Sequence, residues 1–267
     1  MTTPLEATEA RYKFSYPALY RQLFAEGMLD ICQVGPEWLT TEFPRLRPRP
    51  PLLLFGNDFE LMQIADIAEE SAEFLNPDSY REVRPDLRFI PFAMNGAGDL
   101  YCFHLNAATD AGVPIVYVWH DADKATFKAR NLQDFIFRGL LEAVAEVDGD
   151  SLISRGEFGE NCQAMLGTHG PFLSVRQRDI VTQIYRRGLT TQVLQLPMGR
   201  EQTYSGLLSD AELEQLLCAE IGFEQRDRSF GSMREGRPVL DADSGTLSGC
   251  PDARHPSRPK AFWPPRT

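Results

Sequence analysis

The sequence predicts an α+β fold, a mainly antiparallel sheet flanked by helices, with a C-terminal α/β extension. Residues 100–105 are apolar or aromatic on both alternating faces, which is typical of a strand covered on both sides. Residues 113–119 are rich in β-branched and aromatic side chains, which favour a pleated, half-buried surface. Residues 131–147 carry apolar side chains at helical spacing. Strand, glycine turn, strand, strand, helix is therefore the predicted central unit.

The elements before this unit follow from prolines and glycines. We expect residues 1–14 to be loose and polar, and we expect a helix that begins at Pro17 and ends near Gly27. The prolines of residues 43–51 predict an extended connector, although its three arginines also suit a basic ligand-binding tract. The remaining predictions are short strands at 52–55 and 59–62 and a helix at 64–75.

The central unit begins with a strand at 87–92 and a turn at Asn95-Gly96-Ala97-Gly98-Asp99. The G-x-G within this turn is also found in dinucleotide-binding loops. However, the third glycine is absent, and a strand follows where phosphate binding needs a helix N-terminus. A hairpin turn, in which glycine supplies a positive φ, is the better interpretation. Asn131 is the expected N-cap of the closing helix, with Asp134 reaching back to it.

Asp148-Gly149-Asp150 marks a predicted boundary between a domain at 1–148 and an extension at 149–230. The extension has a predicted helix at 158–166 and two helices that begin at capping boxes, at Ser174 and at Ser209. It also has predicted strands at 190–196 and 223–230. Residues 231–267 are rich in glycine, proline, serine and charge, which predicts a disordered tail.

Charge and composition restrict the class of partner. The net charge is −11, and because residues 231–267 carry six basic and four acidic residues, −13 falls on residues 1–230. Such a surface repels nucleic acid and anionic membrane and attracts a basic partner. The five cysteines are far apart and form no C-x-x-C pair, and no apolar run approaches the ~18 residues of a membrane span. We therefore expect a cytoplasmic protein with reduced thiols; the oligomeric state stays open.

The sequence offers no constellation for catalysis, so we predict a protein that is not an enzyme and needs no cofactor or metal. It has no G-x-S-x-G, no P-loop and no H-E-x-x-H. His120-Asp121-Ala122-Asp123 offers possible metal ligands, but it falls where a strand gives way to a loop, and solvated loop residues explain it more simply. Cys162 and His169 are the residue types of a thiol nucleophile and its base, but closeness in sequence does not establish such a pair.

The central unit resembles the SMI1/KNR4 family, also called the SUKH superfamily. The resemblance lies in the order and spacing of a Pro91-Phe92 pair, Gly98-Asp99 at the mouth of an apolar strand, Trp119-His120-Asp121 at the end of a later strand, and the Asn-Leu-Gln-Asp-Phe-Ile helix from Asn131. It covers roughly the first 150 residues. His104 departs from the pattern, since many members carry an acidic residue there, and no role is carried over to it.

The resemblance implies a SUKH-like fold and an immunity protein of a bacterial toxin system, contact-dependent or type VI secretion among them. Such a protein binds a cognate toxin or effector, often a nuclease, and neutralises it by stoichiometric occlusion. Fungal members act as regulatory hubs, so a non-catalytic regulator or scaffold is the alternative. An enzyme of unrecognised type that uses His104, His120 or Cys162 is the third hypothesis.

Exposed carboxylates are the candidate contacts for a basic partner. Four are expected on the helix at 64–75, and two in the loop after the strand at 113–119. The simpler explanation of the helical four is the solvated face of an amphipathic helix. The six candidates are Asp66, Glu69, Glu70, Glu73, Asp121 and Asp123.

Overall fold

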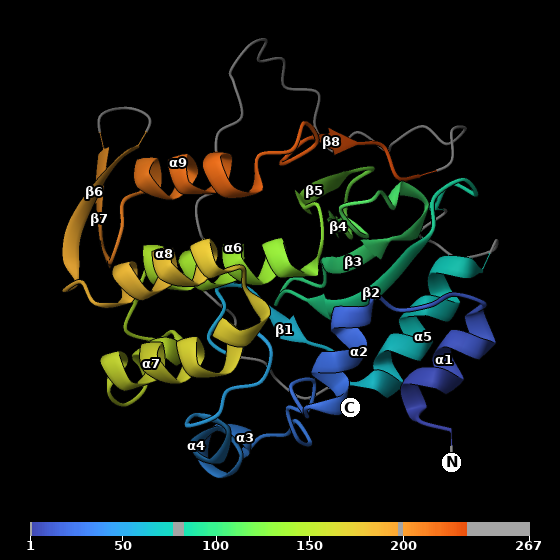
Figure 1. Cartoon of the computed structure of the whole chain (residues 1–267), viewed down its shortest axis with the longest axis horizontal. Coiled ribbons are helices and arrows are strands. Elements are labelled where there is room, and N and C mark those ends of the chain that lie inside the picture. The colour runs from blue at the N-terminus through green and yellow to red at the C-terminus, as the bar shows by residue number, and fades with distance from the viewer. Residues whose placement is uncertain (1, 77–82, 197–199, 234–267) are drawn as a thin grey trace.

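A computed structural model of the chain describes residues 2–76, 83–196 and 200–233, and within them it contains a six-stranded antiparallel sheet in the order β1-β2-β3-β4-β5-β8 (Figure 1). The strands are β1 (Glu60–Leu61), β2 (Phe89–Met94), β3 (Leu100–His104), β4 (Ile115–Val118), β5 (Ala125–Ala129) and β8 (Ser229–Phe230). Every pairing in this sheet is antiparallel. The predicted α+β class is confirmed.

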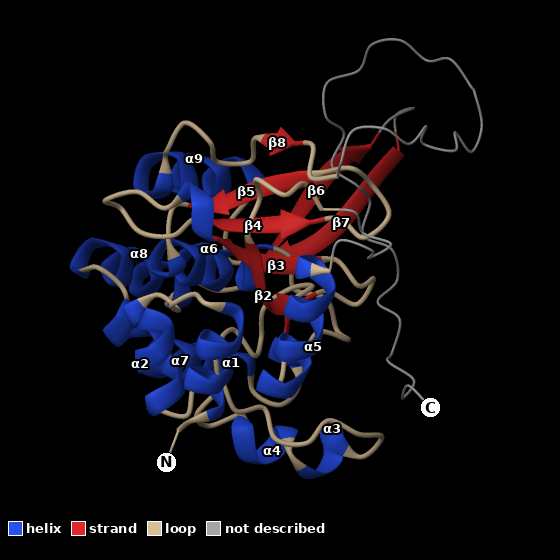
Figure 2. Cartoon of the chain, turned by 90° about the vertical axis from the view of Figure 1, so that its right-hand side faces the viewer, coloured by secondary structure: helices blue, strands red, loops and turns tan. Residues whose placement is uncertain are grey.

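Helices cover both faces of the sheet, with α6, α8 and α9 gathered on one side of the strands (Figure 2). The helices are α1 (Pro4–Tyr12), α2 (Ala18–Ala25), α3 (Trp38–Thr41), α4 (Phe43–Leu46), α5 (Ile64–Leu75), α6 (Leu132–Ala145), α7 (Phe158–His169), α8 (Val175–Tyr185) and α9 (Asp210–Ile221). On one face, Phe92 of β2 packs against Phe135 of α6 and Tyr20 of α2. On the other face, Phe74 of α5 packs edge-on against Phe89. The strands are therefore buried on both sides, as their continuous apolar runs predicted.

The hairpin between β2 and β3 has the predicted glycine turn. Gly98 has a φ of 94°, a conformation that L side chains rarely adopt. The Asn95 side-chain oxygen accepts hydrogen bonds from the backbone N–H groups of Ala97 and Asp99, at 3.0 and 2.8 Å. This Asx-type turn fixes the start of β3.

Two predictions for the first 55 residues are wrong. Residues 4–12 form α1, because Thr3 and Glu6 build a capping box around a first-turn proline, and Leu5 is buried. Residues 52–55 are buried as predicted but form a turn instead of a strand, in which Leu53 has a φ of 49°. A short apolar run does not distinguish a strand from another buried segment by periodicity.

A third prediction, the extended connector at 43–51, is wrong as well: Phe43–Leu46 form a helical turn, α4, with Pro44 in its first turn, where a proline fits. Two strands are missing from the sequence prediction, β5 and β7 (Arg200–Gly206). β5, Ala-Thr-Phe-Lys-Ala, alternates but has only five residues, and β7 is polar. Pairing with β4 and with β6 (Thr190–Leu196) defines these two strands. The predicted last strand shortens to β8.

Residues 149–233 pack on the same core as the first half. The Tyr185 hydroxyl of α8 donates to the Leu140 carbonyl of α6 at 2.9 Å, and Cys162, Met165 and Val181 belong to the common buried cluster. Most of the predicted tail, residues 234–267, lies outside the described residues.

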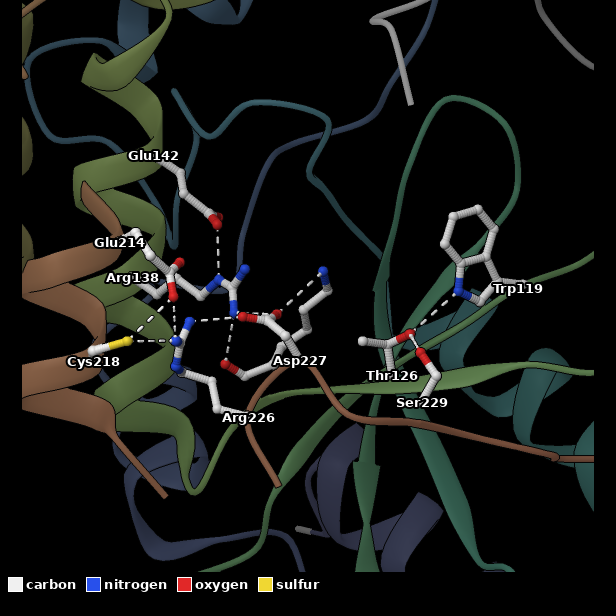
Figure 3. Close-up of polar contacts among 10 residues, drawn as sticks. Trp119, Thr126, Arg138, Glu142, Glu214, Cys218, Arg226, Asp227 and Ser229 are labelled. Atoms are coloured by element: carbon white, nitrogen blue, oxygen red, sulfur yellow. Dashed lines mark hydrogen bonds and ion pairs between the residues drawn. The ribbon is translucent and has the colours of Figure 1, made fainter. Parts of the chain in front are cut away.

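The segment 223–233 returns to the sheet and closes its β5 edge. The Phe230 ring stacks on His104, with centroids 5.7 Å apart. Buried Arg138 of α6 donates to Asp227 at 2.9 Å and to Glu142 at 2.7 Å (Figure 3). The C-terminal segment is thus tied both to the strands and to the helix beneath them.

A pair of glycine substitutions tests how tightly α6 packs against the turn at Leu53. A Cβ atom at Gly139 of α6 would lie 2.6 Å from a Leu53 methyl carbon, whereas one at Gly167 of α7 meets nothing within 4 Å. We expect Gly139→Ala to lower the free energy of unfolding by about 1–3 kcal/mol through overpacking. We expect Gly167→Ala to raise it by roughly 0.5–1 kcal/mol through helix propensity. Urea unfolding of both variants measures this difference, and equal effects would contradict the packing.

Candidate partner-binding surface

The four acidic candidates of α5 lie on a helix held at both ends of its buried face. Ile67 is fully buried, Phe74 packs on β2, and the Tyr12 hydroxyl of α1 donates to the Ala68 carbonyl at 2.7 Å. Asp66 and Glu69 are exposed, while Glu70 and Glu73 are half-buried. Exposed carboxylates on a rigidly packed helix are suited to steer a basic partner at long range.

The two other candidates, Asp121 and Asp123, lie in the loop between β4 and β5 and differ in their contacts. Asp123 accepts hydrogen bonds from the backbone N–H groups of Ser232 and Met233, both at 2.6 Å. Asp121 is exposed and lies beside His120 and Asp99. Both residues are exposed, but Asp123 fastens the C-terminal segment, whereas Asp121 lies beside the Asp99 carboxylate.

A buried carboxylate, Asp99, organises this end of the sheet; in the sequence it was noted as part of the Gly98-Asp99 pair but not predicted as a site residue. Asp99 accepts a hydrogen bond from the Tyr117 hydroxyl at 2.6 Å and one from the Asn95 amide at 3.0 Å. Its other oxygen lies 2.8 Å from the His120 backbone nitrogen and 2.7 Å from the His120 Nδ1. Position alone, at the mouth of an apolar strand, was the available sequence signal.

Electrostatics keep this carboxylate ionised. Burial alone raises the pKa of Asp99, but the hydrogen bonds from Tyr117, His120 and Asn95 outweigh it and hold that pKa below its usual value. Burial, followed by the hydrogen bond to Asp99, raises the pKa of Tyr117 well above its ordinary value. The network therefore joins an ionised carboxylate to a neutral phenol across β3 and β4.

Asp99, His120 and Asp121 together offer two carboxylates and an imidazole, with ligand atoms within 4.8 Å of one another. This is a donor set that a transition metal accepts. Each Asp99 oxygen, however, already accepts two hydrogen bonds from the protein. The geometry supports a structural role in joining the two turns, and it adds nothing that calls for a metal.

Three of the residues considered for catalysis have buried, structural environments: His104, His169 and Cys162. His120, in contrast, is exposed and contacts Asp99. His169 accepts a hydrogen bond from the Leu53 N–H at Nε2, so Nδ1 carries the proton and faces the Met165 carbonyl at 3.0 Å. Burial lowers the pKa of His169 to about 4 and raises the pKa of Cys162 to about 12. Burial also lowers the pKa of His104 to about 4. A protonated thiol and a satisfied neutral imidazole do not make an activated nucleophile and its base.

A hollow of about 580 Å³ lies between α4 and α7 and is open to solvent. Its lining contains none of His104, His120 and Cys162; the residues are Arg47, Pro48, Gly159, Glu160, Asn161, Gln163 and Ala164. The enzyme hypothesis required a deep pocket in which one of those three side chains meets a carboxylate, and this hollow does not provide it.

Comparison with known proteins identifies one family. A family model described as SMI1 / KNR4 family (SUKH-1) matches residues 3–138, half of the chain, from α1 to the middle of α6. No curated protein and no solved structure gives a significant match. None of the helices in residues 2–76, 83–196 and 200–233 combines the length and the apolar character needed to cross a bilayer.

Neighbouring aspartates of the β4–β5 loop provide a matched test of their different contacts. We expect Asp123→Ala to lower the free energy of unfolding by about 1–3 kcal/mol, because two backbone N–H groups lose their acceptor and Ser232 is buried. Asp121→Ala removes the same charge and should change the free energy of unfolding by less than about 0.5 kcal/mol. Chemical unfolding gives both values. Equal effects would mean that Asp123 does not fasten the C-terminal segment.

The depressed pKa of Asp99 predicts a particular pH dependence. A carboxyl whose pKa is lower in the folded state adds stability above its unfolded pKa of ~3.9 and loses it as the pH falls through the folded pKa. The difference in unfolding free energy between the wild type and Asp99→Asn should therefore be largest near neutrality, about 2–3 kcal/mol, and shrink below about pH 4. Unfolding curves at a series of pH values test this. A difference that stays constant into acid would contradict the assignment.

Proposed function

Because the chain belongs to the SMI1/KNR4 family (SUKH-1), we propose that it is an immunity protein that binds a cognate bacterial toxin or effector and neutralises it by stoichiometric occlusion. Family membership is the observation that carries this proposal. It explains a chain with an extensive buried core and exposed acidic candidates, in which Cys162, His104 and His169 are buried and not activated.

The charge supports a basic target, such as a nuclease with a nucleic-acid-binding active site. The chain has a net charge of −11, so its surface repels nucleic acid. The same negative charge attracts a basic protein surface that binds nucleic acid. The proposed first contacts are the exposed carboxylates of Asp66 and Glu69 on α5 and of Asp121 in the β4–β5 loop. Glu70 and Glu73 flank the two on α5. Opposite charge accelerates encounter, and a few buried contacts then carry most of the affinity.

The direct experiment is co-expression with the product of the adjacent gene. We expect a stable complex of fixed stoichiometry and rescue of growth in cells that express the adjacent product alone at a toxic level. A complex without rescue would favour the regulatory or scaffold function. Absence of a complex would overturn the proposal for that pair.

The acidic surface makes a kinetic prediction for the same pair. The association rate constant should fall by about tenfold or more between low salt and physiological salt, because the Debye length shortens from ~30 Å at 0.01 M to ~8 Å at 0.15 M. The double variant Asp66→Lys/Glu69→Lys should associate about tenfold more slowly at low salt. Stopped-flow mixing measures both.

The control is Glu157→Lys/Glu224→Lys, which makes the same change in net charge at exposed positions on α7 and after α9. If the control slows association as much as the α5 variant, net charge and not the α5 face is responsible. Association rates independent of salt would mean that the acidic exterior has no part in recognition.

A further inference from the structure

The hairpin β6–β7 stands apart from the main sheet. In Figure 1 it lies at the left end of the molecule, beyond α9 and α8 and opposite α1 and α5. Its two strands pair in register over seven residues each, from Thr190 opposite Gly206 to Leu196 opposite Arg200. They form a separate two-stranded sheet.

The chain itself contacts one edge of this hairpin. The Val147 N–H donates to the Ser205 carbonyl at 2.7 Å, and the Leu207 N–H donates to the Val144 carbonyl at 2.8 Å. The chain at the end of α6 thus pairs with the outer edge of β7 at its C-terminal end, at Ser205 and at Leu207 just beyond the strand. No strand in the described ranges, 2–76, 83–196 and 200–233, pairs with the outer edge of β6.

The register shows which β6 groups face that edge. The N–H and C=O of one residue in an antiparallel strand point to the same side, so Ser205, which faces Val147, points away from β6. Its register partner Thr191 is therefore in a non-hydrogen-bonded pair and points away from β7. By alternation, Val193 and Gln195 point outward as well. Three N–H groups and three C=O groups are thus directed along the outer edge of β6.

The edge strands of the main sheet are much shorter than β6. Both outer strands of that sheet, β1 and β8, have two residues, and short edge strands limit pairing with other chains. β6 has seven residues and contains no charge and no proline. Val193 and Leu189 are 53% and 47% exposed. Val193 lies in β6 and Leu189 directly precedes it, so two exposed large apolar side chains lie at this strand.

A second copy of the chain is the less suitable occupant. Each copy carries a net charge of −11, so two copies repel. A two-fold contact confined to one strand of seven residues also cannot supply the roughly 1,200–2,000 Å² that stable interfaces bury. A segment of a larger basic partner meets neither difficulty, because the rest of that partner's surface contributes area and charge.

Acidic groups beside the hairpin complement such a partner. Glu146 and Asp148 follow α6 at the β7 edge and are exposed, as is Glu201 of β7. Burial and the nearby carboxylate of Asp210 raise the pKa of Tyr204, with Glu146 contributing, which places both negative charges near β7. These acidic groups therefore lie on the β7 side of the hairpin, one strand away from the uncharged outer edge of β6.

We propose that the outer edge of β6 is a docking strand, onto which the protein partner adds an extended segment with flanking basic residues as a third strand of the hairpin. The backbone groups of Thr191, Val193 and Gln195 make the hydrogen bonds, and the Val193 side chain is the apolar contact. This inference rests on the proposed function, because it needs a protein partner, and it names the contact that holds that partner.

Residue-resolved amide hydrogen exchange tests the docking strand, with the purified product of the adjacent gene as the probe. In the free chain, the N–H groups of Thr191, Val193 and Gln195 should exchange fast, while the alternate amides bonded to β7 are protected. In the complex, the three outward amides should slow by about a hundredfold or more, as expected for newly formed strand hydrogen bonds.

Two proline variants supply the matched comparison. Val193→Pro removes an outward N–H that β7 does not use, as proline is tolerated on a free strand edge. Val175→Pro changes another exposed valine at the first position of α8, where proline also fits. Val193→Pro should raise the Kd about fivefold to tenfold, as expected for one lost hydrogen bond, and Val175→Pro should leave it unchanged. Val193→Lys, which keeps the N–H, provides a second edge variant if the proline disturbs the hairpin.

The outcomes separate the two proposals. If the complex forms but the outward amides exchange as in the free chain, or the β6 variants bind as tightly as the wild type, the docking strand is wrong and the proposed function stands. If no complex forms, both fail. If the outward amides are already protected in the free chain, another part of the chain or a second copy occupies the edge, and the docking strand is overturned; sedimentation then distinguishes monomer from dimer.

Discussion

Closure of the β5 edge is the constraint on which the arrangement of the two halves of the chain depends. An unpaired edge strand exposes a row of backbone groups, and β5 would be such an edge if the chain stopped after α6. Residues 223–233 prevent this: the Phe127 N–H donates to the Arg228 carbonyl, and the Asp227 N–H donates to the Phe127 carbonyl. The matched family region, residues 3–138, thus receives its sixth strand from a segment almost a hundred residues further along the chain.

The polar groups buried around this closure explain several acidic side chains without reference to a partner. Asp227 compensates Arg138, whose guanidinium is buried between α6 and the returning segment. Asp123 accepts hydrogen bonds from two backbone N–H groups, and Asp99 accepts hydrogen bonds from the Tyr117 hydroxyl and the His120 ring. A buried charge without partners is very unfavourable, so these carboxylates are fixed by folding. The 38 acidic residues of the sequence therefore overstate the number of carboxylates available for binding.

The sequence predicted elements where a local signal was sufficient. The helix at 64–75 has the predicted bounds, and Asn131 and Ser174 are the predicted caps, because caps and periodicity are local properties. Prediction failed where distant contacts decide the conformation. Leu53 is held in a turn by His169, and Asp134 pairs with Arg130 and Gln177 instead of reaching back to its own N-cap.

For the candidate surface, the sequence predicted which carboxylates of α5 are exposed but not which loop carboxylate contacts a distant segment. Residue type and helical spacing placed Asp66 and Glu69 in solvent. The same reasoning could not separate Asp121 from Asp123, because the segment that donates to Asp123, Ser232–Met233, lies over a hundred residues away. The outer edge of β6 was beyond prediction as well, since its partner strand β7 was itself missed. Which edge is open becomes visible only when the register and the contact of β7 with the end of α6 are known.

Charge and backbone hydrogen bonding would contribute to recognition at different steps. Exposed ion pairs contribute only about 0–1 kcal/mol each and weaken in salt, so the carboxylates of α5 set how often a basic partner arrives and give little to the lifetime of the complex. Strand addition acts after arrival, because its hydrogen bonds form only at contact distance and become shielded from water by the added segment. A partner that matched the charge but lacked an extended segment would then associate quickly and leave quickly. Under this division, the uncharged edge of β6 and not the acidic exterior discriminates a cognate partner from other basic proteins.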